Sequence, residues 1–353
     1  MTVIYVVLAI VLLGVLITVH EFGHFMAARA TGIAVKEFSI GFGPKLLQWH
    51  SRKHETAFSL RPIPLGGYCM FYGDTDDDPE GKLSKDDPRC YGNAAVWKRI
   101  LTVFAGPLMN FVLAFVVAIA LMAGYGMTVA QPHVESVEAD MPAEQAGLRA
   151  GDVFLAIDGE PIAVGDVNAI TAAISRLPVG QAMTLTVERG GEQLELELLP
   201  QYDEAEERYR IGVMISGAGR LPTGEIVPAA WQSCVYACTA ILNALGKLVT
   251  TGEGLDQTAG PIGVVQMVAQ QTETGGLEMF LQLMVIISIN LGLVNLLPIP
   301  GLDGSRIVFM VIEAIRRKPV SQKVEATIHM TGYLLLFGLM LFFTFRDVGR
   351  LFG

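Results

Sequence analysis

Charged side chains are scarce in this sequence. Asp, Glu, Lys and Arg make up 17% of its 353 residues, whereas soluble domains usually carry about 25%. Hydrophobic residues make up 52%, and the mean hydropathy is +0.46. This composition excludes a disordered chain and argues against an ordinary cytosolic protein.

Excess positive charge and paired cysteines are also lacking. The formal net charge is −10, so the chain offers no basic surface for a nucleic-acid backbone, and no nucleic-acid partner is expected. Its four cysteines form no C-x-x-C pair, which argues against a zinc ribbon or a thioredoxin-type motif. Cys234 and Cys238 share one face of a predicted helix, where a disulfide is geometrically poor, so we expect free thiols.

Long apolar stretches are abundant instead. Residues 2–19, 100–129, 279–302 and 330–345 are each long and apolar enough to enter a bilayer, which takes about 20 apolar residues per helix. The first stretch resembles a signal peptide in length, but no Lys or Arg precedes Arg29, so it lacks a basic n-region. We therefore predict a polytopic α-helical membrane protein with about four transmembrane helices.

Basic residues in the loops predict the orientation of these helices. Eleven lie between the first and second stretches and five between the third and fourth, whereas residues 133–278 hold seven against 21 acidic ones. Basic residues are enriched in cytoplasmic loops. The two basic loops are therefore expected in the cytoplasm, and both termini and the acidic middle region outside it.

The middle region has the pattern of a small α/β domain. Residues 183–198 alternate apolar and polar residues around Gly190-Gly191, which predicts a β-hairpin, and residues 166–177 are expected to form a helix. Residues 142–159, PAEQAGLRAGDVFLAIDG, closely resemble a bacterial PDZ domain. PDZ domains bind extended peptides at a sheet edge. An unrelated small sandwich is the alternative.

Residues 225–251 carry apolar side chains at helical spacing, namely Val227, Trp231, Val235, Cys238 and Leu242. An amphipathic helix on the outer membrane surface explains this stripe. Packing against the transmembrane bundle explains it about as well.

An H-E-x-x-H motif, His20-Glu21-Phe22-Gly23-His24, follows the first apolar stretch. On a helix, residues four apart share one face, so both imidazoles can bind one zinc ion, with Glu21 beside them as a base. A pair of buried structural histidines is the alternative, but ionisable residues in a membrane helix are costly and usually functional. The remaining histidines, at 50, 54, 133 and 329, are expected in loops or at segment edges, as structural or solvated residues.

A hydrolytic zinc site typically has three protein ligands, and the third is expected at the same depth. Asp303 closes the third apolar stretch in the segment NLLPIPGLDG, residues 295–304. Pro298 and Pro300 break the helix there, and irregular backbone at membrane depth must line a cavity or pack against protein. Taken alone, Asp303 would be interpreted as a residue at a segment boundary, but together with the H-E-x-x-H helix it is the candidate third ligand.

Taken together, these motifs resemble the site-2 protease family of intramembrane zinc proteases, in its bacterial RseP-type branch. The resemblance covers essentially the whole chain. It rests on the H-E-F-G-H helix, the N-x-x-P-x-P-x-L-D-G segment and the intervening PDZ-like region, and it includes four shorter motifs: GFGP (41–44), PLGGY (64–68), FAGPLMN (104–110) and GPIG (260–263). It implies zinc as the cofactor, with His20, His24 and Asp303 as ligands and Glu21 as the catalytic base.

The resemblance also implies how substrate is held. Asn295 matches a family position near the reacting peptide. Residues 55–71, rich in strand formers, would form a β-element dipping into the membrane from the cytoplasmic side, with Tyr68 as a substrate-binding residue. An ordinary cytoplasmic hairpin is the alternative. The best-known members of this branch carry two PDZ domains, whereas this chain has room for one.

The sequence therefore predicts a multi-pass enzyme of the bacterial inner membrane. It would cleave single-pass membrane proteins or signal-peptide-like segments within the lipid bilayer, for example anti-sigma factors. We divide it into a first membrane half (1–130), a PDZ-like domain (131–217), an outer amphipathic helix with linker (218–277) and a second membrane half (278–353). A catalytically silent membrane receptor that binds peptides through the PDZ-like domain is the main alternative, and a zinc transporter a weaker one.

Overall fold

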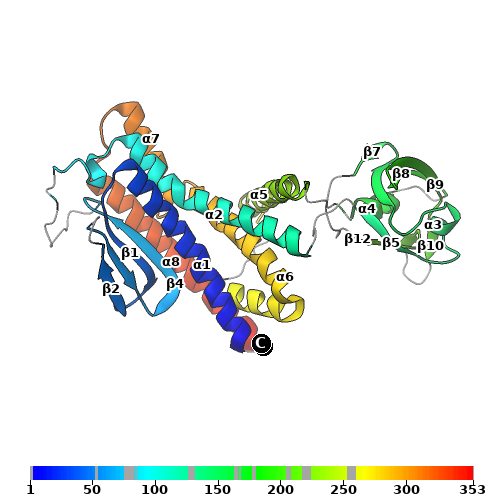
Figure 1. The fold of residues 1–353 in the computed structure, drawn as a ribbon, viewed down its shortest axis with the longest axis horizontal. Helices are drawn as coiled ribbons and strands as arrows, with labels where there is room; N and C mark the ends of the chain where they lie inside the picture. The colour runs from blue at the N-terminus through cyan, green and yellow to red at the C-terminus, as the bar shows by residue number, and fades with distance from the viewer. Residues whose placement is uncertain are drawn as a thin grey trace. The chain divides into compact units, whose positions relative to one another are not determined.

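Two compact units make up the protein. The computed structural model describes residues 3–51, 55–74, 83, 86–125, 132–162, 166, 168–176, 180–203, 208–216, 224–252 and 260–352. One unit comprises Met1–Ala118 and Trp231–Gly353, and the other Ile119–Ala230. Figure 1 shows the elements of each. The four-part division made from the sequence stays a prediction.

Four helices in the described part of the chain are long and apolar enough to cross a membrane: α1 (Val3–Thr31), α2 (Val96–Tyr125), α6 (Pro261–Leu296) and α8 (Gln322–Phe352). At 1.5 Å per residue, each exceeds the hydrocarbon thickness of about 30 Å. This confirms the expected number of membrane helices. The helices also run past the apolar stretches, and α1 continues through the H-E-x-x-H motif to Thr31.

The third membrane segment differs from the prediction at both ends. Helix α6 begins at Pro261 and is interrupted at Gly276, whose φ is 62°. It ends at Leu296, not at residue 302, because a residue before proline is restricted to extended conformations. Leu297, which precedes Pro298, has φ −65° and ψ 144°. Asp303 is then the first residue of a separate helix, α7 (Asp303–Arg316).

The core of the membrane unit lies between α1 and α6. Leu12 and Leu16 of α1 are fully buried against Val268 and Ala269 from the first half of α6 and against Leu283 from its second half. Both halves of the interrupted helix therefore pack on α1.

A four-stranded sheet lies along α1 (Figure 1). It comprises β1 (Val35–Phe42), β2 (Leu47–His50), β3 (Ala57–Leu60) and β4 (Ile63–Phe71), in the order β2-β3-β1-β4. Strand β1 pairs parallel with β3 and antiparallel with β4. The predicted β-element at 55–71 contains β3 and β4, and the structure extends it by two strands.

The second unit is built on a sheet in the order β12-β5-β6-β8-β9, with β7 attached to β6. Its strands are β5 (His133–Val137), β6 (Val153–Ile157), β7 (Glu160–Pro161), β8 (Met183–Arg189), β9 (Glu192–Leu198) and β12 (Val213–Ser216). Helices α3 (Pro142–Gln145) and α4 (Asn168–Arg176) accompany it, and β10 (Gln201–Asp203) pairs with β11 (Arg208–Arg210). Phe154, Ile170 and Leu185 are fully buried in its core. The predicted hairpin and the predicted helix are both confirmed.

Helix α5 (Ile226–Thr250) confirms the helix expected from the apolar spacing at 225–251. Val227, Trp231, Val235 and Leu242 are exposed on it. Core packing therefore does not explain most of this stripe, and a position on the membrane surface stays a prediction.

Candidate metal centre

Helix α1 brings the two histidines of the H-E-x-x-H motif onto one face. His20 and His24 are one turn apart, and each is only 7% exposed. Their rings lie at 87° to each other, and their Nε2 atoms lie side by side. Glu21 is next to His20 on the same helix and is half-buried.

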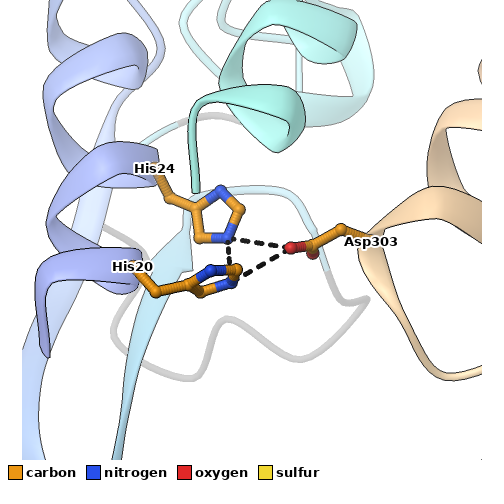
Figure 2. Close-up of side chains that lie close together, drawn as sticks. All are labelled: His20, His24 and Asp303. Carbon is orange, nitrogen blue, oxygen red and sulfur yellow. Dashed lines mark hydrogen bonds and ion pairs between the residues drawn. The ribbon is translucent and has the colours of Figure 1, made fainter. Parts of the chain in front are cut away.

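Asp303 completes a cluster of three candidate ligands (Figure 2). Its Oδ2 atom lies 3.1 Å from His20 Nε2 and 3.4 Å from His24 Nε2. The two Nε2 atoms are 3.2 Å apart. Helix α7 begins at Asp303 after the Pro298–Leu302 loop, so the loop and the helix start together direct this carboxylate toward α1.

These separations fit a zinc ion. Zinc binds histidine nitrogen and carboxylate oxygen at roughly 2.0–2.2 Å in tetrahedral geometry, which places two ligand atoms roughly 3.4 Å apart. The three observed distances lie close to that value. In addition, Asp303 Oδ2 is buried without a hydrogen-bond donor, a costly state that coordination to a cation would relieve. The residues present can therefore hold the ion.

Groups on α2 orient both imidazoles. His24 Nδ1 lies 2.9 Å from the backbone carbonyl of Thr102. Because a carbonyl only accepts, Nδ1 carries the proton and Nε2 keeps a lone pair for a metal. Such partners typically fix the tautomer of metal-binding histidines.

Asn110 has the same role toward His20. Its side-chain amide lies 3.1 Å from His20 Nδ1, and its Oδ1 is buried without a partner. The two ends of an amide are assigned from their hydrogen bonds. With Oδ1 turned toward the ring, this oxygen accepts a hydrogen bond from Nδ1–H. His20 Nε2 then also keeps a lone pair for a metal. Sequence reasoning named FAGPLMN only as a shared motif and missed this role of Asn110.

The same motif also makes space for His24. A Cβ atom at Gly106 would collide with the imidazole ring of His24, and a Cβ at Gly23 would collide with the backbone oxygen of Ala105. Helices α1 and α2 therefore cross at two glycines, which lets the His24 ring reach Thr102.

Glu21 points toward the sheet. The backbone N–H of Cys69 on β4 donates to the Glu21 carboxylate, and Gly67 of the same strand lies close to Glu21 Cγ. This carboxylate is outside the three-atom cluster but next to it, a position that suits a base better than a ligand.

The structure does not bring Tyr68 and Asn295 into this cluster. Arg61 donates to the Tyr68 hydroxyl at 2.6 Å and to Glu37 at 3.0 Å. Burial and the Glu37 carboxylate raise the pKa of Tyr68. Asn295 is half-buried near the end of α6. Their substrate-binding roles stay predictions.

The position expected for one of the other histidines is wrong, but its role is confirmed. His329 lies within α8 rather than at a segment edge. It is structural, because its buried ring packs against Phe309 and accepts a hydrogen bond from the Gly301 N–H at 3.2 Å. His50 and His133 lie at strand ends, and His54 lies outside the described residues.

Comparisons with known proteins show the family of this chain. The model of peptidase family M50 matches residues 8–339. "Putative zinc metalloprotease Atu1380" of Agrobacterium fabrum is 35% identical over 99% of this chain and 97% of its own length. "Regulator of sigma-W protease RasP" of Bacillus subtilis is 31% identical over 98% of this chain and 99% of its own length.

Among solved structures, the PDZ domain of an SdrC-like protein from Listeria monocytogenes is similar to part of the chain. It has 22% sequence identity and a TM-score of 0.23, and the match covers 25% of this chain and 90% of that domain. The family match and the identity over nearly the full length of these relatives show which family the chain belongs to. The chain belongs to peptidase family M50, the site-2 proteases, and is a multi-pass intramembrane zinc metalloprotease.

Proposed function

We propose that His20, His24 and Asp303 hold the zinc ion and that Glu21 is the general base of peptide hydrolysis. The observation that carries this assignment is the convergence of His20 Nε2, His24 Nε2 and Asp303 Oδ2 within 3.1–3.4 Å of one another, at the spacing of tetrahedral ligands. Three ligands leave one coordination position for water or substrate.

A bound zinc ion supplies Lewis-acid chemistry, lowering the pKa of a coordinated water toward neutrality and stabilising negative charge on the peptide carbonyl. Glu21 takes the proton from the attacking water and passes it to the leaving amine. The Cys69 N–H, which donates to Glu21, holds the carboxylate beside the histidines during both transfers. Thr102 and Asn110 keep the two imidazoles in the tautomer that binds metal.

The sheet offers a place to hold substrate extended. Strand β4 is at the end of the sheet order, so one of its edges has no paired strand in the described sheet. Peptide bonds in a helix are shielded by their own hydrogen bonds, and adding a substrate strand to an edge exposes them to attack. We assign Tyr68 and Asn295 to contacts with this strand, with Asn295 as a donor to the developing oxyanion.

The substrates are single-pass membrane proteins or signal-peptide-like segments, including anti-sigma factors. The name of the Bacillus subtilis relative, a regulator of sigma-W, supports this class. The charge distribution of the loops supports cleavage near the cytoplasmic side, in the inner membrane of a bacterium.

Substitution of Glu21 tests the base. We expect Glu21→Gln to abolish cleavage while zinc stays bound, because Glu21 is not a ligand. Membrane peptides that accumulate with this variant, compared with wild type, identify the substrates. The control, Glu197→Gln on the exposed face of β9, is expected to behave as wild type. Equal cleavage by Glu21→Gln would show that Glu21 is not the base, and loss of zinc would make it a ligand.

Substitution of Asp303 tests the third ligand. We expect Asp303→Ala to lower the zinc content of purified protein, whereas Asp158→Ala, in the PDZ-like domain, leaves it unchanged. Metal analysis of the two purified variants measures this difference in zinc content. An unchanged zinc content in Asp303→Ala would remove this residue from the ligand set.

A further inference from the structure

Helix α7 turns charged side chains toward the protein and apolar side chains outward. This is the reverse of an amphipathic helix on a soluble protein. Two charged residues in its middle face the protein: Arg306 lies 3.5 Å from Asp74, and Glu313 lies 2.5 Å from Arg99. Met310, on the same side, is buried in an apolar cluster. These two charges are therefore paired inside the molecule.

The opposite face is apolar and exposed. Val308, Val311, Ile312 and Ile315 follow the i, i+3, i+4, i+7 spacing of one helical stripe and are 43%, 42%, 37% and 77% exposed. With 14 residues, α7 is about 21 Å long, which is too short to span the bilayer. An apolar stripe of this kind in water would be unfavourable, so lipid is the environment that suits it.

The C-terminal end of α7 is basic. Arg316, Arg317 and Lys318 follow the stripe directly, and Lys323 stands at the start of α8; all four side chains are exposed. None of the described residues forms an ion pair with them. Four unpaired cations beside an apolar stripe complement an anionic lipid headgroup above its acyl chains.

A tryptophan marks the same level of the molecule. Trp97, at the start of α2, is 62% exposed, and it lies two residues from Arg99, the partner of Glu313. Tryptophan is enriched where the hydrocarbon region meets the headgroups. A position of this end of α7 at the headgroup level would account for the exposed tryptophan.

We propose that α7 is a lipid-facing interfacial helix and that Arg316, Arg317, Lys318 and Lys323 form a binding site for anionic phospholipid. This site is separate from the catalytic cluster and does not depend on the roles assigned there.

The test uses the full-length protein in neutral detergent. Thermal stability is measured while short-chain phosphatidylglycerol, short-chain phosphatidylcholine or inorganic phosphate is added. We expect only phosphatidylglycerol to raise the melting temperature in a saturable way. Each basic residue near an anionic surface contributes about fivefold to binding, so Arg316→Gln/Arg317→Gln/Lys318→Gln should bind about a hundredfold more weakly at low salt.

Matched variants keep the result interpretable. Arg316→Lys/Arg317→Lys preserves charge and should bind as wild type, and Lys318→Gln alone should weaken binding about fivefold. Zinc content reports whether each variant is folded. An equal response to both phospholipids, or full binding by the triple Gln variant, would overturn the proposal. A response to phosphate alone would replace the lipid site by a phosphate site.

A second measurement addresses the stripe itself. In vesicles that contain brominated phosphatidylglycerol, the added fluorescence of Ile315→Trp should be quenched. Fluorescence that is insensitive to brominated lipid and quenched by aqueous iodide would place the stripe in water and overturn the lipid-facing assignment.

Discussion

The imidazole of His24 occupies the volume that a side chain at position 106 would need. A Cβ added to Gly106 would meet three atoms of this ring, and the ring cannot move away without losing the Thr102 carbonyl on its Nδ1. Position 106 therefore controls where a candidate ligand points, although glycine itself contacts no metal.

We expect Gly106→Ala to weaken zinc binding by about 10–100-fold, the usual cost of disturbing the groups that orient a ligand. Competition with a zinc chelator measures it. Gly124→Ala is the matched control, because it lies in the same helix and a Cβ there has no neighbour within 4 Å. Equal zinc affinity in both variants would mean that the His24 ring can bind zinc from another position, and would contradict this role of Gly106.

Residue patterns predicted part of this site and missed the rest for a physical reason. His20 and His24 form a local motif, since four residues on a helix fix their geometry. Asn110 and Thr102 act through contacts between helices, and no spacing within either helix records which side chain of α2 faces α1. The close approach of Gly106 to the His24 ring likewise depends on how α1 and α2 pack, which neither helix sequence records alone.

At the scale of elements, α7 is the part that carries Asp303 to the histidines. Two ion pairs hold it: Arg99 on α2 contacts Glu313 at 2.5 Å, and Asp74, just after β4, contacts Arg306 at 3.5 Å. The side chains of Arg99 and Glu313 are mostly buried. Loss of one partner from such a pair leaves an uncompensated charge, which typically costs about 3–5 kcal/mol.

We expect Arg99→Glu to lower zinc affinity, because two facing acids would push the end of α7 away from α2. The double variant Arg99→Glu/Glu313→Arg restores an opposite pair and should recover most of the affinity. Zinc titration of the wild type and of the three variants, including Glu313→Arg alone, forms a complete cycle. Additive losses in the double variant would show that this pair does not position α7.

The PDZ-like unit contains a buried carboxylate whose ion pair is expected to govern its stability. The side chain of Asp152 is 1% exposed, and Arg189 donates to it twice at 2.7 Å. Burial alone would raise the pKa of Asp152, but Arg189 and the backbone N–H of Arg149 outweigh it and hold the pKa below its usual value.

A carboxyl with a lowered folded-state pKa stabilises the fold above its unfolded pKa, about 3.9, and that stabilisation is lost as the pH falls through the folded value. We therefore expect the domain to lose hydrogen-exchange protection at β8 below about pH 4. Asp152→Asn should show reduced protection already at pH 7, because the neutral amide no longer pairs with Arg189. Glu195→Gln, on exposed β9, is the control. Wild-type protection in Asp152→Asn would contradict this role.

The elements that local sequence patterns specify were predicted best. The β8–β9 hairpin and the four long helices follow from alternation, turn residues and apolar length. The sheet beside α1 was only half predicted, because β1 pairs parallel with β3, from Glu37–Ala57 to Ile40–Leu60. Such a pairing depends on segments about 20 residues apart. His329 was misplaced for a similar reason, since its burial depends on the loop before Asp303.

At the scale of the whole molecule, basic residues are unevenly distributed along the chain. Residues 133–278 hold 21 acidic and seven basic residues, whereas 16 of the 25 basic residues lie in the two segments that join the first to the second and the third to the fourth apolar stretch. This asymmetry is the basis for assigning the PDZ-like domain to the outside and cleavage to the cytoplasmic side. Under that assignment the domain supplies no catalytic group, and its proposed role is to select substrates by the size or end of their external part.

Deletion of residues 131–217, with a flexible linker in their place, tests this role. We expect zinc binding to be preserved, because all three candidate ligands lie outside the deleted region. Substrates with very short external tails should still be cut, and some substrates with bulky external domains should now be admitted. Cleavage of a tail-length series in proteoliposomes measures this, with Glu21→Gln in the deletion background as the inactive control. If the deletion variant binds zinc and cuts nothing, the domain is required for the catalytic conformation and does not act as a filter.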